Sequence, residues 1–195
     1  MLSGYVSLRH FPLQSVSGVK VAHLAPPPPV TLDSPAPLVM TDFLQIPAAT
    51  IEPEASADYS TDYMRRRNVR ALLVLDGGEV VGILTATDVL GEKPIKLALS
   101  SGMKRAEIRV VDLMTPRASL ELLAYEEVRQ ARVGHVVETL RQAGRQHFLV
   151  GEHAPDGERV RGIFSISQIA RQLGIAIETV SFAQTFAEIE AALRD

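Results

Sequence analysis

Hydrophobic and polar positions follow the same order twice along the middle of the chain. Each pass predicts a helix, an apolar strand, a turn and a second strand, and the second strand leads directly into another helix start. The predicted ranges are 58–68, 69–75, 76–78 and 80–84 in the first pass, and 131–143, 146–150, 154–157 and 160–164 in the second. This order predicts two units of mixed α+β structure built to the same plan.

The segments that close the two passes are alike residue by residue. Gly82-Ile-Leu-Thr-Ala-Thr-Asp88 ends the first pass, and Gly162-Ile-Phe-Ser-Ile-Ser-Gln168 ends the second, 80 residues later. Thr41 and Thr115 end two similar opening motifs that lie 74 residues apart, so the offset grows by only a few residues. Surface connections tolerate such insertions. The chain therefore contains a duplication, and its copies differ in a carboxylate, since Asp88 corresponds to Gln168.

The two ends of the chain lie outside the duplication. Pro26 to Pro29 form a four-proline run, which predicts an extended, non-helical arm over residues 1–37, with a short strand at 19–24. The arm is either a loosely held tail or a segment that docks on its own domain or on a partner. The predicted division is an arm at 1–37, a first copy at 38–105, a second copy at 106–178 and an amphipathic C-terminal helix at 179–195. The apolar stripe of that helix is interpreted as core packing or as a partner site.

Composition narrows the class of protein. The 195 residues are 46% hydrophobic, carry a formal net charge of −3 and include no cysteine. A disulfide framework, a cysteine-ligated metal and a broad basic surface for nucleic acid are excluded. No apolar run is long enough to cross a membrane, and no signal-peptide pattern starts the chain. We expect a cytoplasmic protein with no metal, no nucleic-acid partner and no membrane.

Catalytic motifs are missing from the sequence. There is no Gly-x-Ser-x-Gly nucleophile motif, no Walker or dinucleotide glycine pattern, and no metal-ligand spacing among the five histidines. We therefore expect a protein that is not an enzyme. The basic run Arg65-Arg-Arg67 is interpreted as a solvated helix face, with a phosphate or nucleic-acid contact as the alternative.

The repeated segment supports two interpretations of its chemistry. Thr85-x-x-Asp88 and Ser165-x-x-Gln168 both have the spacing of a helix capping box, which is purely structural. Alternatively, each segment lies where a strand ends and a helix begins, and a carboxylate there can accept hydrogen bonds from the two hydroxyls of a ribose. The glycine that opens the segment would let such a ligand approach the backbone.

The order of these motifs resembles that of the CBS domain, present in tandem as a Bateman module. The resemblance covers about residues 38–178 and rests on the openings Val39-Met-Thr41 and Asp112-Leu-Met-Thr-Pro116, the strands Leu72-Leu-Val-Leu-Asp76 and Phe148-Leu-Val-Gly-Glu152, and the two closing segments. It implies two β-α-β-β-α units packed sheet to sheet with pseudo-twofold symmetry. It also implies two clefts that bind adenosine-containing ligands such as AMP, ADP, ATP or S-adenosylmethionine.

The resemblance also implies which residues line each cleft. The first cleft would use Ile83, Thr85, Asp88, Thr115, Arg145, Gln146 and His147. The second would use Thr41, Val69, Arg70, Ser165 and Gln168. Gln168 departs from the family pattern because it accepts hydrogen bonds without carrying charge, and charge-assisted hydrogen bonds are about twice as strong. We expect the second cleft to bind nucleotide weakly, to bind something else or to stay empty.

The function expected from these residues is regulatory. The main hypothesis is a non-enzymatic module that senses an adenine nucleotide or S-adenosylmethionine, forms a homodimer and acts through an unidentified effector protein. The alternative is a structural dimerisation or interaction module that has lost ligand binding, in which the repeated segments act only as caps.

Overall fold

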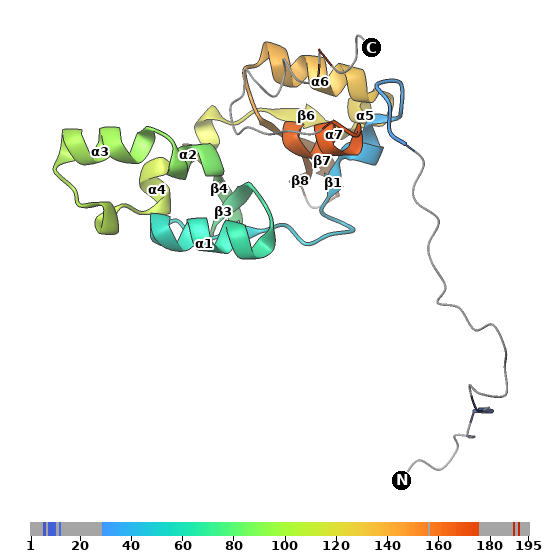
Figure 1. The fold of residues 1–195 in the computed structure, drawn as a ribbon, viewed down its shortest axis with the longest axis horizontal. Coiled ribbons are helices and arrows are strands. Elements are labelled where there is room, and N and C mark those ends of the chain that lie inside the picture. Colours follow the sequence, from blue (N-terminus) through green and yellow to red (C-terminus); the bar gives the residue numbers. More distant parts are fainter. Residues whose placement is uncertain are drawn as a thin grey trace.

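Two lobes of similar design form the body of the protein (Figure 1). The structure, a computed structural model, describes residues 29–155 and 157–175 together with residues 6, 8–10, 12, 189 and 191. Within this part, each lobe contains a four-stranded sheet, with strand order β2-β3-β4-β5 in the first and β1-β8-β7-β6 in the second. The predicted α+β class with two related units is confirmed.

The first lobe follows the predicted order of elements. Its main elements are β2 (Thr50–Ile51), α1 (Ala57–Arg67), β3 (Ala71–Asp76), β4 (Glu79–Thr85), α2 (Ala86–Leu90) and α3 (Lys93–Ser101). Helix α1 starts at Ser56, whose side chain accepts a hydrogen bond from the backbone N–H of Tyr59, and it ends at Asn68 in the left-handed conformation. Gly77 and Gly78 both have positive φ, which the tight β3–β4 hairpin requires.

The second lobe repeats this order. Its elements are β6 (Leu122–Ala124), α5 (Tyr125–Val128), α6 (Val133–Gln142), β7 (His147–Ala154), β8 (Gly157–Ser165) and α7 (Ile166–Gln172). The β7–β8 hairpin pairs His147 with Ser165, as β3–β4 pairs Ala71 with Thr85. His147 and Ala71 thus occupy equivalent positions in the two copies.

The opening segments are exchanged between the lobes. The 3-10 helix η2 (Ala36–Val39) and β1 (Thr41–Asp42) begin the first copy, yet β1 pairs with β8 of the second. Helix α4 (Val110–Leu113) and β5 (Thr115–Pro116) begin the second copy, and β5 pairs with β4 of the first. The ranges 38–105 and 106–178 are therefore a division of the sequence, whereas in space each opening completes the other copy's sheet. The short turns η3 (Arg105–Glu107) and η4 (Arg117–Ser119) flank the second opening.

The glycines that open the two repeated segments allow this exchange. A Cβ on Gly82 would lie 2.6 Å from the sulfur of Met114 and 2.8 Å from the carbonyl oxygen of Thr115. A Cβ on Gly162 would lie 2.6 Å from the carbonyl oxygen of Thr41. The expectation that these glycines admit a ligand is wrong, because the opening segment of the other copy already fills the space beside them.

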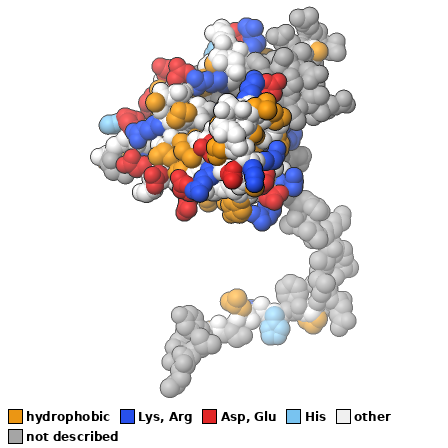
Figure 2. All heavy atoms as spheres, turned by 90° about the vertical axis from the view of Figure 1, so that its left-hand side faces the viewer, with side chains coloured by type: hydrophobic (Ala, Val, Ile, Leu, Met, Phe, Trp, Pro, Cys, Tyr) orange, Lys and Arg blue, Asp and Glu red, His pale blue; other side chains and the backbone are white. Residues whose placement is uncertain are grey.

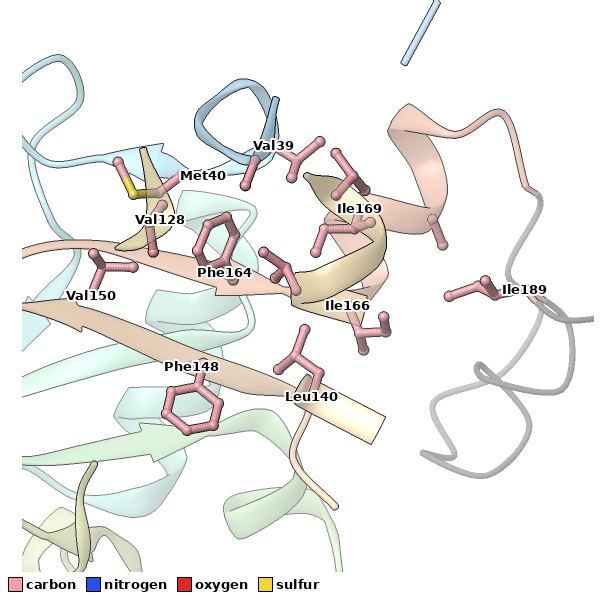
Figure 3. Packing of buried hydrophobic residues seen from close by; sticks show 14 residues of the cluster. Val39, Met40, Val128, Leu140, Phe148, Val150, Phe164, Ile166, Ile169 and Ile189 are labelled. Atoms are coloured by element: carbon pink, nitrogen blue, oxygen red, sulfur yellow. The ribbon is translucent and has the colours of Figure 1, made fainter. Parts of the chain in front are cut away.

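Three apolar clusters hold the fold together. Figure 3 shows the cluster of the second lobe, in which Phe164, Leu140 and Ile169 are fully buried between the sheet and its helices. A matching cluster around Leu72 and Leu84 fills the first lobe. The third cluster contains Leu73 and Ile83 from one sheet and Leu149 from the other, so the lobes pack sheet against sheet.

An ion pair fixes the exchanged strand β1. Arg161 on β8 donates two 2.8 Å hydrogen bonds to the carboxylate of Asp42 and one to Glu152. Its guanidinium also lies 4.4 Å from the centre of the Tyr125 ring. The hydrogen bonds from Arg161 hold the pKa of Asp42 below its usual value. Because both side chains are nearly buried, this ion pair belongs to the packed interior and links β1 to β8, unlike a solvated surface ion pair.

Parts of the two predicted end segments belong to the second lobe. The backbone carbonyls of Leu32 and Ser34 accept hydrogen bonds from Gly134 and Val133, which satisfies the first N–H groups of α6. Ile189 is 1% exposed and lies in the apolar cluster of that lobe. The rest of the predicted arm, its strand at 19–24 and most of the C-terminal helix lie outside the described residues.

The face of the first lobe that Figure 2 shows has a mixed character. Figure 2 looks at the end of the molecule that lies on the left in Figure 1, and acidic, basic and hydrophobic side chains intermingle there. None of the helices in the described ranges is both long and apolar enough to cross a bilayer.

Candidate functional site: two cavities between the lobes

The residues predicted for the first cleft lie around one cavity of about 300 Å³. They come from β4, α2 and β5 on one side and from β7 and the loop before it on the other. All seven predicted residues line it, namely Ile83, Thr85, Asp88, Thr115, Arg145, Gln146 and His147. Glu121 also lines this cavity, and the sequence interpretation missed it. We call this space the first cavity.

The residues predicted for the second cleft surround a separate cavity of about 380 Å³. Thr41, Val69, Arg70, Ser165 and Gln168 all line it. They come from β1, from the connection between α1 and β3, and from the end of β8 with α7. We call this space the second cavity. The sequence thus identified residues that the fold gathers at both places.

In the first cavity, Asp88 already has several partners. Its Oδ2 accepts hydrogen bonds from the backbone N–H of Thr85 at 2.8 Å and from the Thr85 hydroxyl at 2.6 Å, while Lys93 forms an ion pair with Oδ1. The capping box predicted at Thr85 is therefore confirmed. Lys93 also donates to the carbonyl of Leu113. The sequence interpretation missed Lys93, although it lies only five residues after Asp88.

The cation of the first cavity is paired as well. Arg145 lies 2.8 Å from the carboxylate of Glu121, and its guanidinium lies 5.3 Å from the centre of the Phe148 ring. The side chain of Gln146 accepts a 3.3 Å hydrogen bond from Thr87. Both charged groups that the sequence predicted for a ligand, Asp88 and Arg145, therefore have an opposite charge beside them.

The second cavity differs because its repeated segment does not cap the helix. Ser165 precedes α7 but makes no capping hydrogen bond, and its hydroxyl lies 3.0 Å from that of Ser167. Gln168 instead accepts a 3.1 Å hydrogen bond from the Thr41 hydroxyl. The capping interpretation of Ser165-x-x-Gln168 is wrong, because the exchanged strand β1 provides a partner that the local sequence does not show.

Four arginines line the second cavity. Arg66 and Arg67 come from the end of α1, Arg70 from just before β3, and Arg171 from α7. The lining includes no aspartate or glutamate, and none of the four forms an ion pair with a carboxylate of the described residues. Of these, the sequence interpretation placed only Arg70 in this cleft, and it took the basic run mainly as a solvated face, with a phosphate contact as the alternative. The available signal was that this run directly precedes the predicted residues Val69 and Arg70.

His147 lines both cavities and so forms part of the wall between them. Its Nδ1 is buried and has no hydrogen-bond partner among the described residues. Burial, together with the positive charge of Arg70, lowers the pKa of His147 to about 4, while the charge of Asp88 acts in the opposite direction. The imidazole is therefore neutral at pH 7.

The side chains that line the two cavities are mostly polar groups of the kinds that bind ligands. His147 is the sole histidine among the residues that line the two cavities, and no hydroxyl or carboxylate is hydrogen-bonded to its Nδ1 in the described part of the chain. Within the same ranges, no group of three or more metal-binding side chains is found. What both cavities offer is hydroxyl groups, amides and charged groups arranged around a small space.

Comparison with known proteins agrees with this architecture. The model of the CBS domain family matches residues 22–94. A crystal structure of an uncharacterized conserved protein from Pyrococcus horikoshii is similar to this chain with a TM-score of 0.54 and 22% identity, covering 77% of this chain and all of the other. CBSX2, a CBS-pair protein from Arabidopsis thaliana, has a crystal structure in complex with AMP that is similar with a TM-score of 0.50 and 20% identity, covering 71% of this chain and 94% of the other. None of the curated proteins matches the sequence significantly.

The class of protein follows from the fold and the family match together. The chain has the fold of the CBS-pair proteins, and the part of it at residues 22–94 matches the CBS domain family. Its fold places two cavities between the copies.

Proposed function

We propose that the protein is a non-enzymatic regulatory module that binds an adenosine-containing ligand in the first cavity. The candidate ligands are AMP, ADP, ATP and S-adenosylmethionine. The observation that carries the proposal is the convergence of seven predicted residues from separate segments of both copies on one cavity of about 300 Å³, a volume at the lower end of the usual range for ligand sites. The AMP complex of CBSX2, which shares the fold, supports the choice of ligand class.

When the ligand binds, Asp88 and Arg145 would give up their ion-pair partners within the protein and contact the ligand instead. Asp88 would accept hydrogen bonds from the ribose hydroxyls through Oδ1, the oxygen now paired with Lys93. Lys93 is free to turn away because its side chain is 51% exposed. Arg145 would likewise leave Glu121, whose side chain is 68% exposed, to meet a phosphate or carboxylate of the ligand. The ligand's affinity is therefore set by competition with two existing ion pairs.

For ligand binding to regulate another protein, this protein must have two structural arrangements that differ in their affinity for the ligand. We propose that the protein forms a homodimer and that ligand binding favours one dimer arrangement, which a separate effector protein recognises. Leu90, Ile95 and Leu99 on α2 and α3 are exposed apolar side chains and would suit such a contact.

The second candidate function is a structural dimerisation or interaction module without a ligand. It is favoured by the bonding of Asp88, which Thr85 and Lys93 already hold in a state that needs no ligand. On that proposal the first cavity is a gap between two caps, and adenosine compounds leave the stability of the protein unchanged.

A ligand screen with matched variants separates the two proposals. AMP, ADP, ATP and S-adenosylmethionine are added to the protein, and unfolding is followed by thermal shift and binding by calorimetry. The sensor proposal predicts stabilisation of about 2.7 kcal/mol at a hundredfold excess of ligand over Kd. Asp88→Asn keeps the cap's hydrogen-bond acceptor but removes the charge, and it should weaken binding at least tenfold.

The matched control is Asp112→Asn. Asp112 is also the fourth residue of a capping box, since it accepts a 2.8 Å hydrogen bond from the backbone N–H of Arg109, but it does not line either cavity. It should leave binding unchanged. No response to any of the four ligands at millimolar concentration would support the structural module instead.

A further inference from the structure

We infer that the second cavity is a binding site for a compound that carries several phosphate charges, recognised by its phosphates and not by a ribose. The inference does not depend on what the first cavity binds. It rests on the charge of the lining, on the separate origins of that charge, and on the bonding of Gln168.

The two cavities differ sharply in charge. The first is lined by Asp88 and Glu121 together with one arginine, Arg145. The second is lined by four arginines and no acidic residue. Arginine presents planar donors that match phosphate oxygens, and positive charges gathered around one space are stabilised by an anion between them. The second cavity therefore favours a ligand with multiple negative charges.

The positive charge that lines the second cavity does not come from the end of one helix alone. Cations near the carboxyl end of a helix are stabilised by its dipole, and this accounts for a basic last turn in α1, where Arg65 also pairs with Asp62 and Arg66 lies over Tyr59. It does not account for Arg70, which follows the helix, or for Arg171, which comes from α7 in the other copy. Three segments thus direct positive charge to one cavity.

Gln168 fits an anion better than the carboxylate that stands at the equivalent position in the first copy. Its Oε1 accepts the hydrogen bond from Thr41, so its Nε2 is left as a donor. A carboxylate there would repel a phosphate, whereas the amide can donate to one. Ser165 and Ser167 add hydroxyl groups to the lining and are not used to cap α7. The substitution at residue 168 therefore changes which ligand is bound and does not abolish the site.

The size of the cavity and the position of His147 agree with this ligand class. A volume of about 380 Å³ accommodates a compound of nucleotide size. The buried Nδ1 of His147 has no partner in the described ranges, and a ligand or a water beside it would supply one. In the equivalent place the first copy has Ala71, which carries no polar group.

Calorimetry with three probes tests the recognition of phosphate directly. The probes are inorganic tripolyphosphate, ATP and adenosine, each titrated into the full chain. Tripolyphosphate and ATP are expected to bind, with affinity that falls as salt is raised, and adenosine is not expected to bind at this site. If ATP binds while tripolyphosphate does not bind at millimolar concentration, recognition of the phosphates alone is overturned.

Variants assign the binding to the second cavity. Arg70→Gln and Arg171→Gln should each weaken tripolyphosphate binding by about tenfold or more. Arg65→Gln is the matched control, because Arg65 belongs to the same basic run but does not line the cavity, and it should have little effect. Equal losses from Arg65→Gln and Arg70→Gln would show general attraction to a basic surface and would overturn the inference.

Two further substitutions separate this site from the first cavity. Gln168→Asp places a carboxylate against the anion and should weaken tripolyphosphate binding at least tenfold. If Gln168→Asp instead leaves tripolyphosphate binding unchanged and strengthens adenosine binding, the cavity recognises a ribose and the inference fails. Arg145→Gln in the first cavity should leave tripolyphosphate binding intact, and a loss caused by Arg145→Gln alone would also overturn the inference. Because tripolyphosphate carries no adenosine, an absence of AMP binding in the first cavity leaves the tripolyphosphate test decisive.

Discussion

The hydroxyl of Thr41 donates a 3.1 Å hydrogen bond to Gln168, a residue 127 positions further along the chain. This bond links the exchanged strand β1 to the closing segment of the other copy. Because Gln168 accepts this bond, it does not complete a capping box at α7. The two copies therefore share the spacing of a hydroxyl residue and a polar residue three positions later, but they differ in their hydrogen bonds. Asp88 is a cap held by internal partners, and Gln168 is a cavity residue with a free donor.

Because the exchanged strands pass close to Gly82 and Gly162, adding a methyl group to either glycine should lower the free energy of unfolding considerably. Gly82→Ala and Gly162→Ala would each place a Cβ under 3 Å from the backbone oxygen of the crossing segment. Overpacking of this kind costs about 1–3 kcal/mol. Urea unfolding should show this loss for both variants.

The control for the glycine variants is Gly134→Ala in α6. A Cβ there would have ordinary contacts, 3.5 Å or more from Leu32. Because alanine favours a helix over glycine, Gly134→Ala should be neutral or stabilising by up to about 1 kcal/mol. A Gly82→Ala variant as stable as the wild type would contradict the described packing of the opening segments.

The Arg161–Asp42 pair is expected to contribute strongly to the attachment of β1. Arg161→Met leaves the carboxylate of Asp42 nearly buried and without its cation, and such losses cost about 3–5 kcal/mol. Arg159→Met removes a more exposed arginine that also contacts Glu152, and it should cost less than about 1 kcal/mol. Chemical unfolding of both variants measures the difference, and equal small effects would contradict a structural role for the buried pair.

His147 predicts a loss of stability in mild acid. Its pKa is about 4 in the folded protein and about 6.5 in the unfolded chain, so the unfolded chain binds the proton first. The contribution of neutral His147 to the free energy of unfolding is fully present above pH 6.5. It is lost as the pH falls from 6.5 to 4, and the loss reaches about 3 kcal/mol. Asp42 acts in a different window, because its lowered pKa makes its contribution disappear only below its usual value of 3.8.

Two variants assign the pH dependence to this residue. His147→Asn should remove most of the decline in unfolding free energy between pH 6.5 and pH 4. His153→Gln alters a histidine side chain that is 82% exposed and should retain the decline. An unchanged pH profile in His147→Asn would show that the buried ring is not its cause.

Lys93 should act as a competitor of the ligand in the first cavity. Lys93→Met leaves Asp88 held by Thr85 alone, so Oδ1 becomes available to ribose hydroxyls. Uncharged adenosine, which gains nothing from the lysine, should bind roughly tenfold more tightly, the size of one charge-assisted hydrogen bond. Lys96→Met removes an exposed lysine of the same helix that pairs with Glu92, and calorimetry should show no change. Weaker adenosine binding in Lys93→Met would contradict the competition.

Local patterns in the sequence predict a large part of this structure. The helix periodicity of α1 and α6 and the glycine turn after Asp76 were sufficient to locate both copies. The resemblance of the motifs named twelve residues that the fold gathers at two cavities. These features depend on short segments whose periodicity or motif order is visible in the chain.

What the sequence did not predict depends on contacts between distant segments. The pairing of β1 with β8 gives Gln168 a partner, and no local pattern shows it. Arg171 joins Arg66 at the second cavity only because α7 and α1 approach each other there. The role of Gly82 was misjudged for the same reason, since its neighbour Met114 comes from the other copy.

The central claim, that Asp88 holds a ribose in the first cavity, is tested most directly by removing both sides of that contact. Calorimetry compares AMP with 2′,3′-dideoxy-AMP on the wild type and on Asp88→Asn. The wild type should lose at least tenfold in affinity for the dideoxy compound, and Asp88→Asn should bind the two compounds equally, since the two changes remove the same interaction. Equal affinity of the wild type for both compounds, or no binding of AMP at millimolar concentration, would contradict the claim.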